Sequence, residues 1–161
     1  MIRFSILVAS DQGSAGQRED RSGPAIAALL KESGAELLES RLVPDERPLI
    51  AATLIQMCDR GADLILTSGG TGFSPRDVTP EATLDVIERQ VPGIPEAMRA
   101  RSLAITPRAM LSRAVAGIRG RTLIINLPGS PKAVRECLEV VLPVLDHAIA
   151  ILTGTTGECA R

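Results

Sequence analysis

Short apolar runs alternate along the chain with longer segments that carry apolar residues at helical spacing. The apolar runs predict strands, and their nearly continuous hydrophobicity is typical of strands buried on both faces. Strands are predicted at residues 4–9, 36–42, 63–67 and 122–126, with a further short one just before Gly120. Helices are predicted at residues 24–33, 48–60, 80–90 and 95–104, and from Pro131 to about residue 152.

The last predicted helix has the clearest amphipathic pattern. Ser130 can cap it, and Pro131 suits its first position. One apolar stripe recurs at steps of three and four residues: Val134, Leu138, Val141, Leu145, Ile149 and Leu152. Pro143 lies inside this stripe, so we expect a kink there without an end to the helix.

Strands that alternate with helices imply right-handed connections between parallel strands, with helices packed on the sheet. The sequence therefore predicts an α/β fold: a three-layer single domain with a mostly parallel sheet and helices on both faces. Its 161 residues, 45% of them hydrophobic, have the size and composition of one globular domain, which we expect to span residues 1–161.

Polar turns follow the four clearest strands, at residues 10–14, 44–46, 68–72 and 127–130. Together they are unusually rich in Gly, Ser, Thr and Asp. Because the carboxyl ends of parallel strands meet at one edge of the sheet, these turns should lie together, at the edge where α/β sheets bind ligands. The pattern predicts a site for a small molecule that carries phosphate.

The loop at residues 68–72 contains three glycines, Gly69, Gly70 and Gly72. Without β-carbons, its backbone amides can approach an anion closely, and the hydroxyls of Ser68 and Thr71 add donors. The loop matches neither the G-x-x-x-x-G-K-[ST] phosphate loop nor the G-x-G-x-x-G dinucleotide motif. A turn without a ligand is the alternative, but a position between a buried strand and a helix favours anion binding.

Two aspartates lie in or near these turns. Asp45 follows the second strand, and Asp77 lies five residues beyond Gly72. Each could simply cap the helix after it. Alternatively, the two carboxylates could share one Mg²⁺ ion, which usually takes one or two carboxylates together with phosphate and water.

Few other residues offer catalytic chemistry. His147 is the single histidine and belongs to the last predicted helix, so a Ser-His-Asp or Cys-His mechanism has little support. Cys58, Cys137 and Cys159 show no metal-binding or redox spacing, and the first two are expected to be small core residues. Phosphoryl or nucleotidyl transfer suits this chain better, because it depends on positioning and charge stabilisation, and a phosphate nucleophile needs no general base.

Charge and aromatic content limit the partners. The net charge is −1, and residues 97–135 contain eight Lys and Arg but no Asp or Glu, which suggests a solvated or intersubunit face, or a cationic wall beside an anionic ligand. A nucleic-acid binder is disfavoured, because Phe4 and Phe73 are the only aromatic residues. With no signal peptide and no membrane-spanning run, we expect a cytoplasmic protein without a membrane partner.

Longer motifs in the same order resemble the family of Mog-type molybdopterin adenylyltransferases, within the MogA/MoaB group. The resemblance rests on the glycine loop followed by Arg-Asp-Val-Thr-Pro-Glu-Ala-Thr at residues 76–83, on Arg-Leu-Val-Pro-Asp-Glu at 41–46, on Asn-Leu-Pro-Gly-Ser-Pro-Lys-Ala at 126–133, and on Ser-Asp at 10–11. It covers essentially the whole chain.

The resemblance implies an activity: AMP is joined to the terminal phosphate of molybdopterin from ATP and Mg²⁺, and pyrophosphate is released. It implies that Asp45 and Asp77 are the two functional aspartates. The ligand site would be lined by Ser10, Asp11, Ser68, Gly69, Gly70, Thr71, Gly72, Pro128, Gly129 and Ser130.

The family further implies a homotrimer and a handover of the adenylylated product for insertion of molybdenum or tungsten. The alternative within the group is a non-catalytic, MoaB-like pterin-binding or assembly module. The chain lacks extra sequence that some members carry before the C-terminus, but the segments around Asp45 and Asp77 favour an active enzyme.

Overall fold

The computed structural model describes residues 1–156, and six strands of this part form one sheet in the order β2-β1-β3-β6-β5-β4. The strands are β1 (Arg3–Ala9), β2 (Glu36–Val43), β3 (Leu64–Ser68), β4 (Arg89–Gln90), β5 (Ala116–Arg119) and β6 (Thr122–Leu127). The pairs β2–β1, β1–β3 and β3–β6 are parallel. The pairs β6–β5 and β5–β4 are antiparallel, so the sheet is mostly parallel, as predicted.

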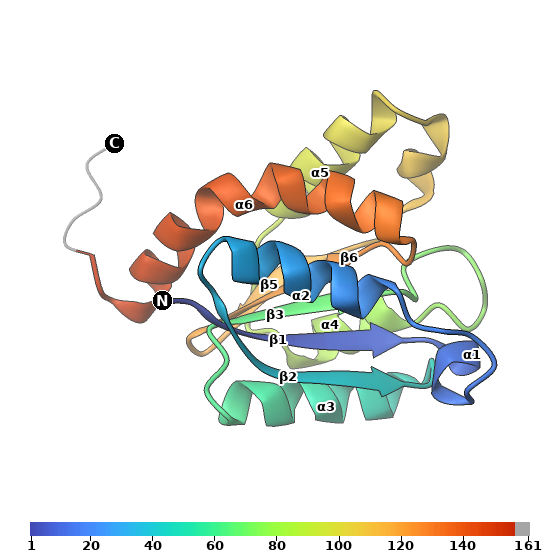
Figure 1. Cartoon of the computed structure of the whole chain (residues 1–161), viewed down its shortest axis with the longest axis horizontal. Coiled ribbons are helices and arrows are strands. Elements are labelled where there is room, and N and C mark those ends of the chain that lie inside the picture. Colours follow the sequence, from blue (N-terminus) through green and yellow to red (C-terminus); the bar gives the residue numbers. More distant parts are fainter. Residues whose placement is uncertain (157–161) are drawn as a thin grey trace.

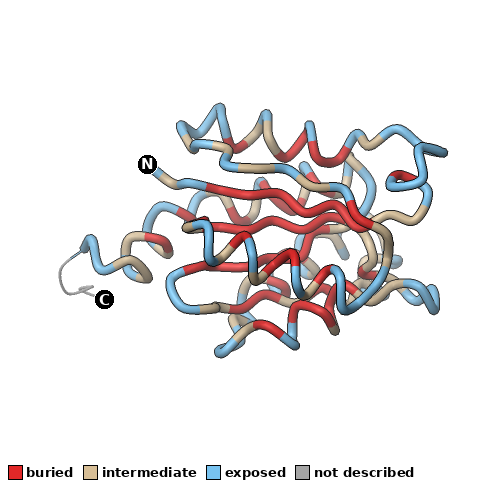
Figure 2. The backbone as a smooth tube through the Cα atoms, turned by 90° about the horizontal axis from the view of Figure 1, so that it is seen from below, coloured by how far each residue is buried: buried red, intermediate tan, exposed pale blue. Residues whose placement is uncertain are grey.

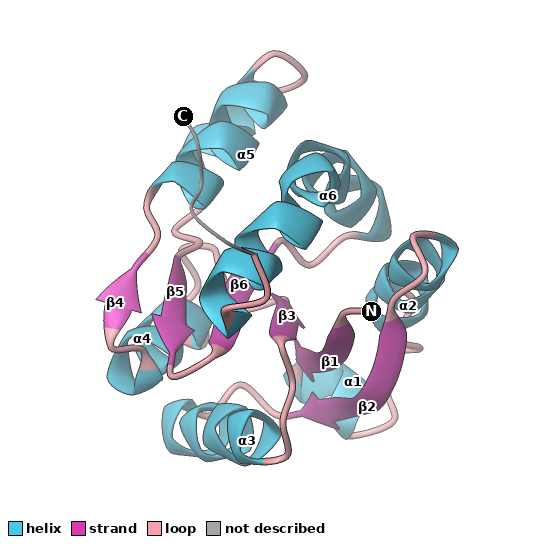
Figure 3. Ribbon diagram, turned by 90° about the vertical axis from the view of Figure 1, so that its left-hand side faces the viewer, coloured by secondary structure: helices cyan, strands magenta, loops and turns pink. Residues whose placement is uncertain are grey.

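Helices cover both faces of this sheet (Figure 3). They are α1 (Asp11–Ser14), α2 (Ser22–Glu32), α3 (Arg47–Asp59), α4 (Thr79–Val86), α5 (Gly93–Leu103) and α6 (Pro131–Thr153), with a 3₁₀ helix, η1, at Pro107–Leu111. α2, α5 and α6 lie on one face, and α3 and α4 on the other (Figures 1 and 3). The predicted three-layer α/β fold is therefore confirmed.

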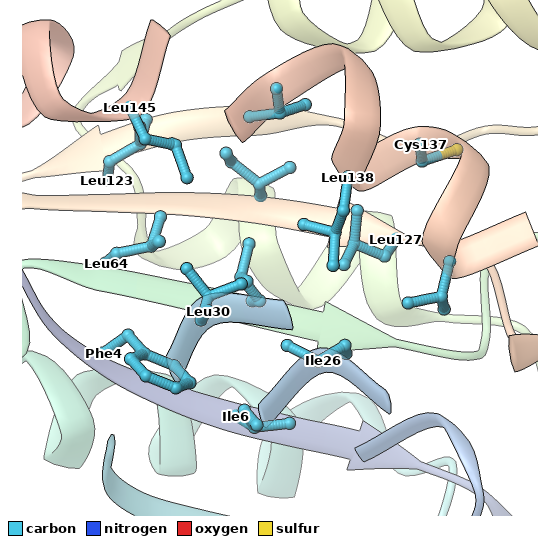
Figure 4. Packing of buried hydrophobic residues seen from close by; sticks show 14 of the residues in the cluster. Phe4, Ile6, Ile26, Leu30, Leu64, Leu123, Leu127, Cys137, Leu138 and Leu145 are labelled. Atoms are coloured by element: carbon cyan, nitrogen blue, oxygen red, sulfur yellow. The ribbon is translucent and has the colours of Figure 1, made fainter. Parts of the chain in front are cut away.

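The core consists of two aliphatic layers, one on each face of the sheet. Side chains of successive strand residues point to opposite faces, so Ile6 packs in one layer and Leu7 in the other. The first layer joins β1, β3 and β6 to α2, α5 and α6, with Phe4 as its aromatic member (Figure 4). In Figure 2 the central strands are buried along most of their length, as their apolar runs predict.

The region after α4 corrects one prediction. The predicted helix over residues 80–90 ends at Val86, and Arg89–Gln90 forms β4 at the edge of the sheet. A β-carbon at Gly117 would collide with Ile87 and with the carbonyl oxygen of Arg89. This glycine therefore allows the segment to pair closely with β5, and that tertiary contact outweighs local helical propensity.

Helix starts also differ in detail from the prediction. Residues 11–14, predicted as loop, form α1, because Ser10 Oγ accepts a hydrogen bond from the Gly13 amide (2.9 Å). Thr79 is the first residue of α4, not its cap. Ser130 does cap α6, which runs through Pro143 without ending.

The described cysteines behave as small core residues. Cys137 is buried and Cys58 half-buried, and burial raises the pKa of both thiols. Neither lines the main cavity described below, although Cys137 lines the second, smaller one. Cys159 lies outside the described residues. Among residues 1–156, no helix is both long and apolar enough to cross a membrane.

Candidate functional site

An open cavity of about 610 Å³ lies at the carboxyl ends of the parallel strands, where the arrowheads of β1 and β2 point in Figure 1. Turns that follow β1, β2, β3 and β6 all contribute to it, together with the start of α2. It brings together eight of the predicted site residues: Ser10, Asp45, Ser68, Gly69, Gly70, Asp77, Gly129 and Ser130. The expected meeting of distant turns at one sheet edge is therefore present.

The glycine loop fits this place only because it lacks β-carbons. Gly69 and Gly70 have φ angles of +89° and +67°, which favour glycine. A β-carbon at Gly69 would collide with the carbonyl oxygen of Ala9, at the end of β1. One at Gly70 would collide with Thr79 Oγ1 and lie 3.2 Å from Asp45 Oδ1. The loop thus packs directly against β1 and the Asp45 carboxylate.

Three carbonyl oxygens of the loop accept hydrogen bonds from other segments. Gly70 O accepts a hydrogen bond from the Thr79 amide (3.1 Å), Thr71 O from the Arg113 amide (2.9 Å), and Gly72 O from Arg113 Nε (2.7 Å). All described peptides are trans, so the N–H group of each unit points away from its carbonyl. These three N–H groups, of Thr71, Gly72 and Phe73, donate no hydrogen bond to another residue within 1–156, and Thr71 and Gly72 line a second cavity rather than the main one.

Arg113 holds this loop and the Asp77 turn together. Besides Gly72 O, its guanidinium donates to the Asp77 carbonyl oxygen (2.7 Å) and pairs with Glu81. A guanidinium presents several donors in one rigid plane, which a lysine ammonium cannot reproduce. Arg113 therefore sets the relative position of the glycine loop and Asp77.

We expect Arg113→Lys to lower the free energy of unfolding by about 1–3 kcal/mol, because carbonyl and carboxylate partners lose their donors. Displacement of the loop should also lower, by about tenfold, the turnover of the AMP transfer that the sequence analysis expects. Arg119→Lys is the control, since Arg119 donates one hydrogen bond, to the Val86 carbonyl oxygen, away from the cavity. Urea denaturation and steady-state kinetics measure both effects. Equal turnover of the two variants would contradict this role of Arg113.

The two aspartates are not helix caps. Neither α3 nor α4 has a side-chain hydrogen bond at its N-cap, which is Glu46 in α3 and Val78 in α4. Asp45 Oδ2 accepts from the Asp11 amide (2.9 Å), and Asp77 Oδ2 accepts from the Ser74 amide (3.0 Å). Both carboxylates line the cavity, so the capping alternative is wrong for each.

Asp45 has the features of a cation ligand. Its Oδ1 atom is buried without a hydrogen-bond partner, at the position that a β-carbon of Gly70 would approach. Burial raises the pKa of this carboxyl, and the negative charges of Asp11 and Asp77 raise it further, against a hydrogen bond from the Asp11 amide. A hard divalent cation would satisfy the orphaned oxygen and compensate the charge, so the residues present fit Mg²⁺.

Positive charge in the cavity comes from a segment that the sequence analysis did not single out. Arg18 and Arg21 line the cavity from the loop before α2, as do Glu19 and Asp20 between them, and Arg21 pairs with Glu19 (3.4 Å). Ser130 and Pro131, at the start of α6, also line it. The N-terminus of a helix attracts anions. The position of residues 10–20 directly after the first strand was the available signal for this segment.

Two serine hydroxyls hold the turn after β6. Ser68 Oγ donates to the Pro128 carbonyl oxygen (2.8 Å), and Ser22 Oγ donates to the Gly129 carbonyl oxygen (2.6 Å). The Ser68 hydroxyl was predicted to donate a hydrogen bond to an anion. In the structure it donates to the backbone instead and thereby holds the turn after β6 in place.

Other predicted residues lie elsewhere. Thr71, Gly72 and Pro128 line a second cavity of about 280 Å³, between the glycine loop, α5, η1 and α6. Asp11 lines neither cavity. None of the basic side chains of residues 97–135 lines the main cavity, so the alternative that this segment forms a cationic wall beside the ligand is not supported there.

Comparison with known proteins connects this geometry to a family. Residues 5–147 match the family model described as a probable molybdopterin binding domain. The molybdopterin adenylyltransferase of Helicobacter pylori strain J99 is 49% identical over 156 residues, which cover 95% of this chain and 89% of that protein.

Solved structures agree in fold. The molybdopterin biosynthesis enzyme MoaB from Thermus thermophilus superposes with a TM-score of 0.91 at 55% identity, over 96% of this chain and 98% of that one. A structure of MogA gives a TM-score of 0.89 at 43% identity, over 93% and 99% of the two chains.

Proposed function

The chain belongs to the family of molybdopterin-binding domains that includes the molybdopterin adenylyltransferases, and from this premise we propose that it transfers AMP from ATP to the terminal phosphate of molybdopterin in molybdenum cofactor biosynthesis. The observation that carries the proposal is the buried, unpartnered Asp45 Oδ1 beside the glycine loop, in the cavity that Asp77 also lines. This is an arrangement suited to a metal-bound nucleotide.

The reaction requires little covalent chemistry from the protein. An oxygen of the pterin phosphate attacks the α-phosphorus of ATP, the bond from that phosphorus to the bridging oxygen breaks, and pyrophosphate leaves. The nucleophile is already ionised at pH 7, so no general base is needed, which agrees with a cavity whose described lining contains no histidine. Catalysis then depends on alignment and on stabilisation of negative charge.

Each group of the cavity has a role in this scheme. Asp45 and Asp77 would hold Mg²⁺, which when bound supplies positive charge beside the phosphate oxygens. The amides of Gly69 and Gly70, the glycines of the loop that line the main cavity, would bind phosphate groups together with Arg18 and Arg21. Gly129 and Ser130 would place the N-terminus of α6 against the anionic ligands.

Further properties follow from the family and complete the proposal. We propose that residues 1–161 act as one molybdopterin-binding domain, that the protein assembles as a homotrimer, and that it works in the cytoplasm, where ATP is available. The adenylylated pterin would pass to an enzyme that inserts the metal.

The test is to incubate the protein with molybdopterin, Mg²⁺ and ATP labelled at the α-phosphate. We expect a labelled AMP–pterin adduct, released pyrophosphate, and loss of both on chelation with EDTA. A non-catalytic pterin-binding module would bind molybdopterin without acquiring label. Folded protein that binds the pterin but forms no adduct would reject the enzyme.

A further inference from the structure

The carboxylate of Asp11 connects the turns that follow three different strands. It accepts two hydrogen bonds from Arg76, Nε to Oδ2 at 2.9 Å and Nη2 to Oδ1 at 3.0 Å. Its Oδ1 also accepts from the Asp45 amide (2.9 Å), while the Asp11 amide donates to Asp45 Oδ2 (2.9 Å). Asp11 and Asp45 are thus bonded reciprocally, and Arg76 is fixed to the same carboxylate.

The contacts of Asp11 connect it to both candidate magnesium ligands, Asp45 and Asp77. Asp45 is held through its carboxylate and its amide, and Arg76 immediately precedes Asp77 in the chain. A continuous series of contacts therefore runs from Asp45 through Asp11 and Arg76 to Asp77. The Asp11–Arg76 contact is therefore one of the contacts that hold the two carboxylates lining the cavity, alongside those of Asp77 with Ser74 and Arg113.

The ion pair has the character of a positioning element rather than of a major source of stability. The side chains of Arg76 and Asp11 are 58% and 40% exposed, and exposed ion pairs stabilise folds only slightly. Neither residue lines the main cavity. The Asp11 side chain is already occupied by Arg76 and Asp45, and this corrects the expectation that it lines the ligand site.

We propose that the Asp11–Arg76 ion pair positions Asp45 and Asp77 at their working separation without either of its side chains contacting the substrates. The proposal rests on the function proposed above, because the separation matters only if both carboxylates serve one metal-bound nucleotide. A displacement of about 1 Å in such a site can reduce turnover by about 100-fold.

The chain contains a matched control for this ion pair. Arg47 and Asp85 form a second two-bond pair, with Nε to Oδ2 at 2.7 Å and Nη2 to Oδ1 at 2.8 Å. Their side chains are 51% and 41% exposed, close to the values of the Asp11–Arg76 pair. This second pair joins α3 to α4, and neither of its residues lines the main cavity.

The experiment compares Asp11→Ala, Arg76→Ala and their double variant with Arg47→Ala and Asp85→Ala. We expect kcat to fall by about 100-fold in each single variant at the site, with a smaller change in KM for ATP. The double variant should be no slower than the slower single variant, because both changes remove one element. The control variants should keep the wild-type kcat, and Arg76→Ala, Arg47→Ala and Asp85→Ala should show similar, small shifts in Tm. Asp11→Ala should lower Tm somewhat more, because the Asp45 amide also loses its acceptor.

Mn²⁺ affinity, measured by the electron paramagnetic resonance signal of free Mn²⁺, provides a readout that does not require turnover. It should weaken by about tenfold or more in Asp11→Ala and Arg76→Ala and stay unchanged in the controls. A wild-type protein that binds Mn²⁺ but transfers no AMP would refute the proposed function and leave this comparison valid. Loss of turnover in Arg76→Ala with retention in Asp11→Ala would overturn the inference, since Arg76 would then act on substrate directly. Wild-type turnover and Mn²⁺ affinity in both would overturn it as well.

Discussion

Asp45→Asn should strongly lower AMP transfer and at the same time raise the stability of the ligand-free protein at pH 7. The activity should fall by about 10³-fold, because the buried oxygen loses the charge with which it would bind the metal. Asp77→Asn should cause a comparable loss of turnover. Binding of molybdopterin, measured by calorimetry, should change much less than turnover in both variants.

The expected gain in stability follows from the sign of the pKa shift. Burial raises the pKa of Asp45 in the folded state, so folding favours the protonated carboxyl. The contribution of this group to stability is present below its unfolded pKa and is lost as the pH rises through the folded value. At pH 7 the ionised group therefore opposes folding, and the neutral asparagine removes that cost.

The pKa of Asp11 is shifted in the opposite direction to that of Asp45. The hydrogen bonds from Arg76, followed by the one from the Asp45 amide, lower its pKa in the folded state. Its contribution is present above the unfolded pKa and is lost as the pH falls through the folded value. Thermal unfolding at a series of pH values separates the two groups. A lower Tm for Asp45→Asn than for wild type at pH 7 would contradict the assignment of Asp45 as a buried carboxylate that is kept for function at a cost in stability.

Gly69→Ala should destabilise the fold severely, by about 3 kcal/mol or more, because a positive φ and a backbone collision act together. The new β-carbon would meet the carbonyl oxygen of Ala9, a main-chain atom of β1 that cannot rotate away. Urea denaturation measures the loss. Turnover should fall as well, since the loop amides would be displaced from the cavity.

Gly34→Ala isolates the conformational part of this cost. Gly34 has the same φ angle, +89°, but no atom lies within 4 Å of its β-carbon position. Its replacement should cost only about 1 kcal/mol and leave turnover unchanged. If the two variants lost equal stability, close packing of the glycine loop against β1 would not be the reason for glycine at position 69.

Much of this architecture could be predicted from local pattern. Nearly continuous apolar runs such as residues 4–9 predict buried parallel strands, and the parallel direction places the polar turns at one edge. Ser130 with Pro131 identifies the start of α6 from two neighbouring residues. These features depend on periodicity, capping and steric preference, which act over a few residues.

The partners of individual side chains required the tertiary structure. Asp11 and Arg76 are 65 residues apart, and Arg113 lies 41 residues beyond Gly72, so no local pattern reveals that they meet. Likewise, β4 exists because Gly117 leaves space for its neighbour, against the helical preference of its own residues.

The sequence by itself determined the fold class, the edge at which the site lies, and Asp45, Asp77 and the glycine loop as its candidate residues. Only the tertiary structure decided which polar groups remain free in that site and which are used to hold it together. The reason is physical: the turns are brought together by burial of the apolar strands, whereas the hydrogen-bond partner of each polar side chain depends on which atoms of the other turns come within about 3 Å.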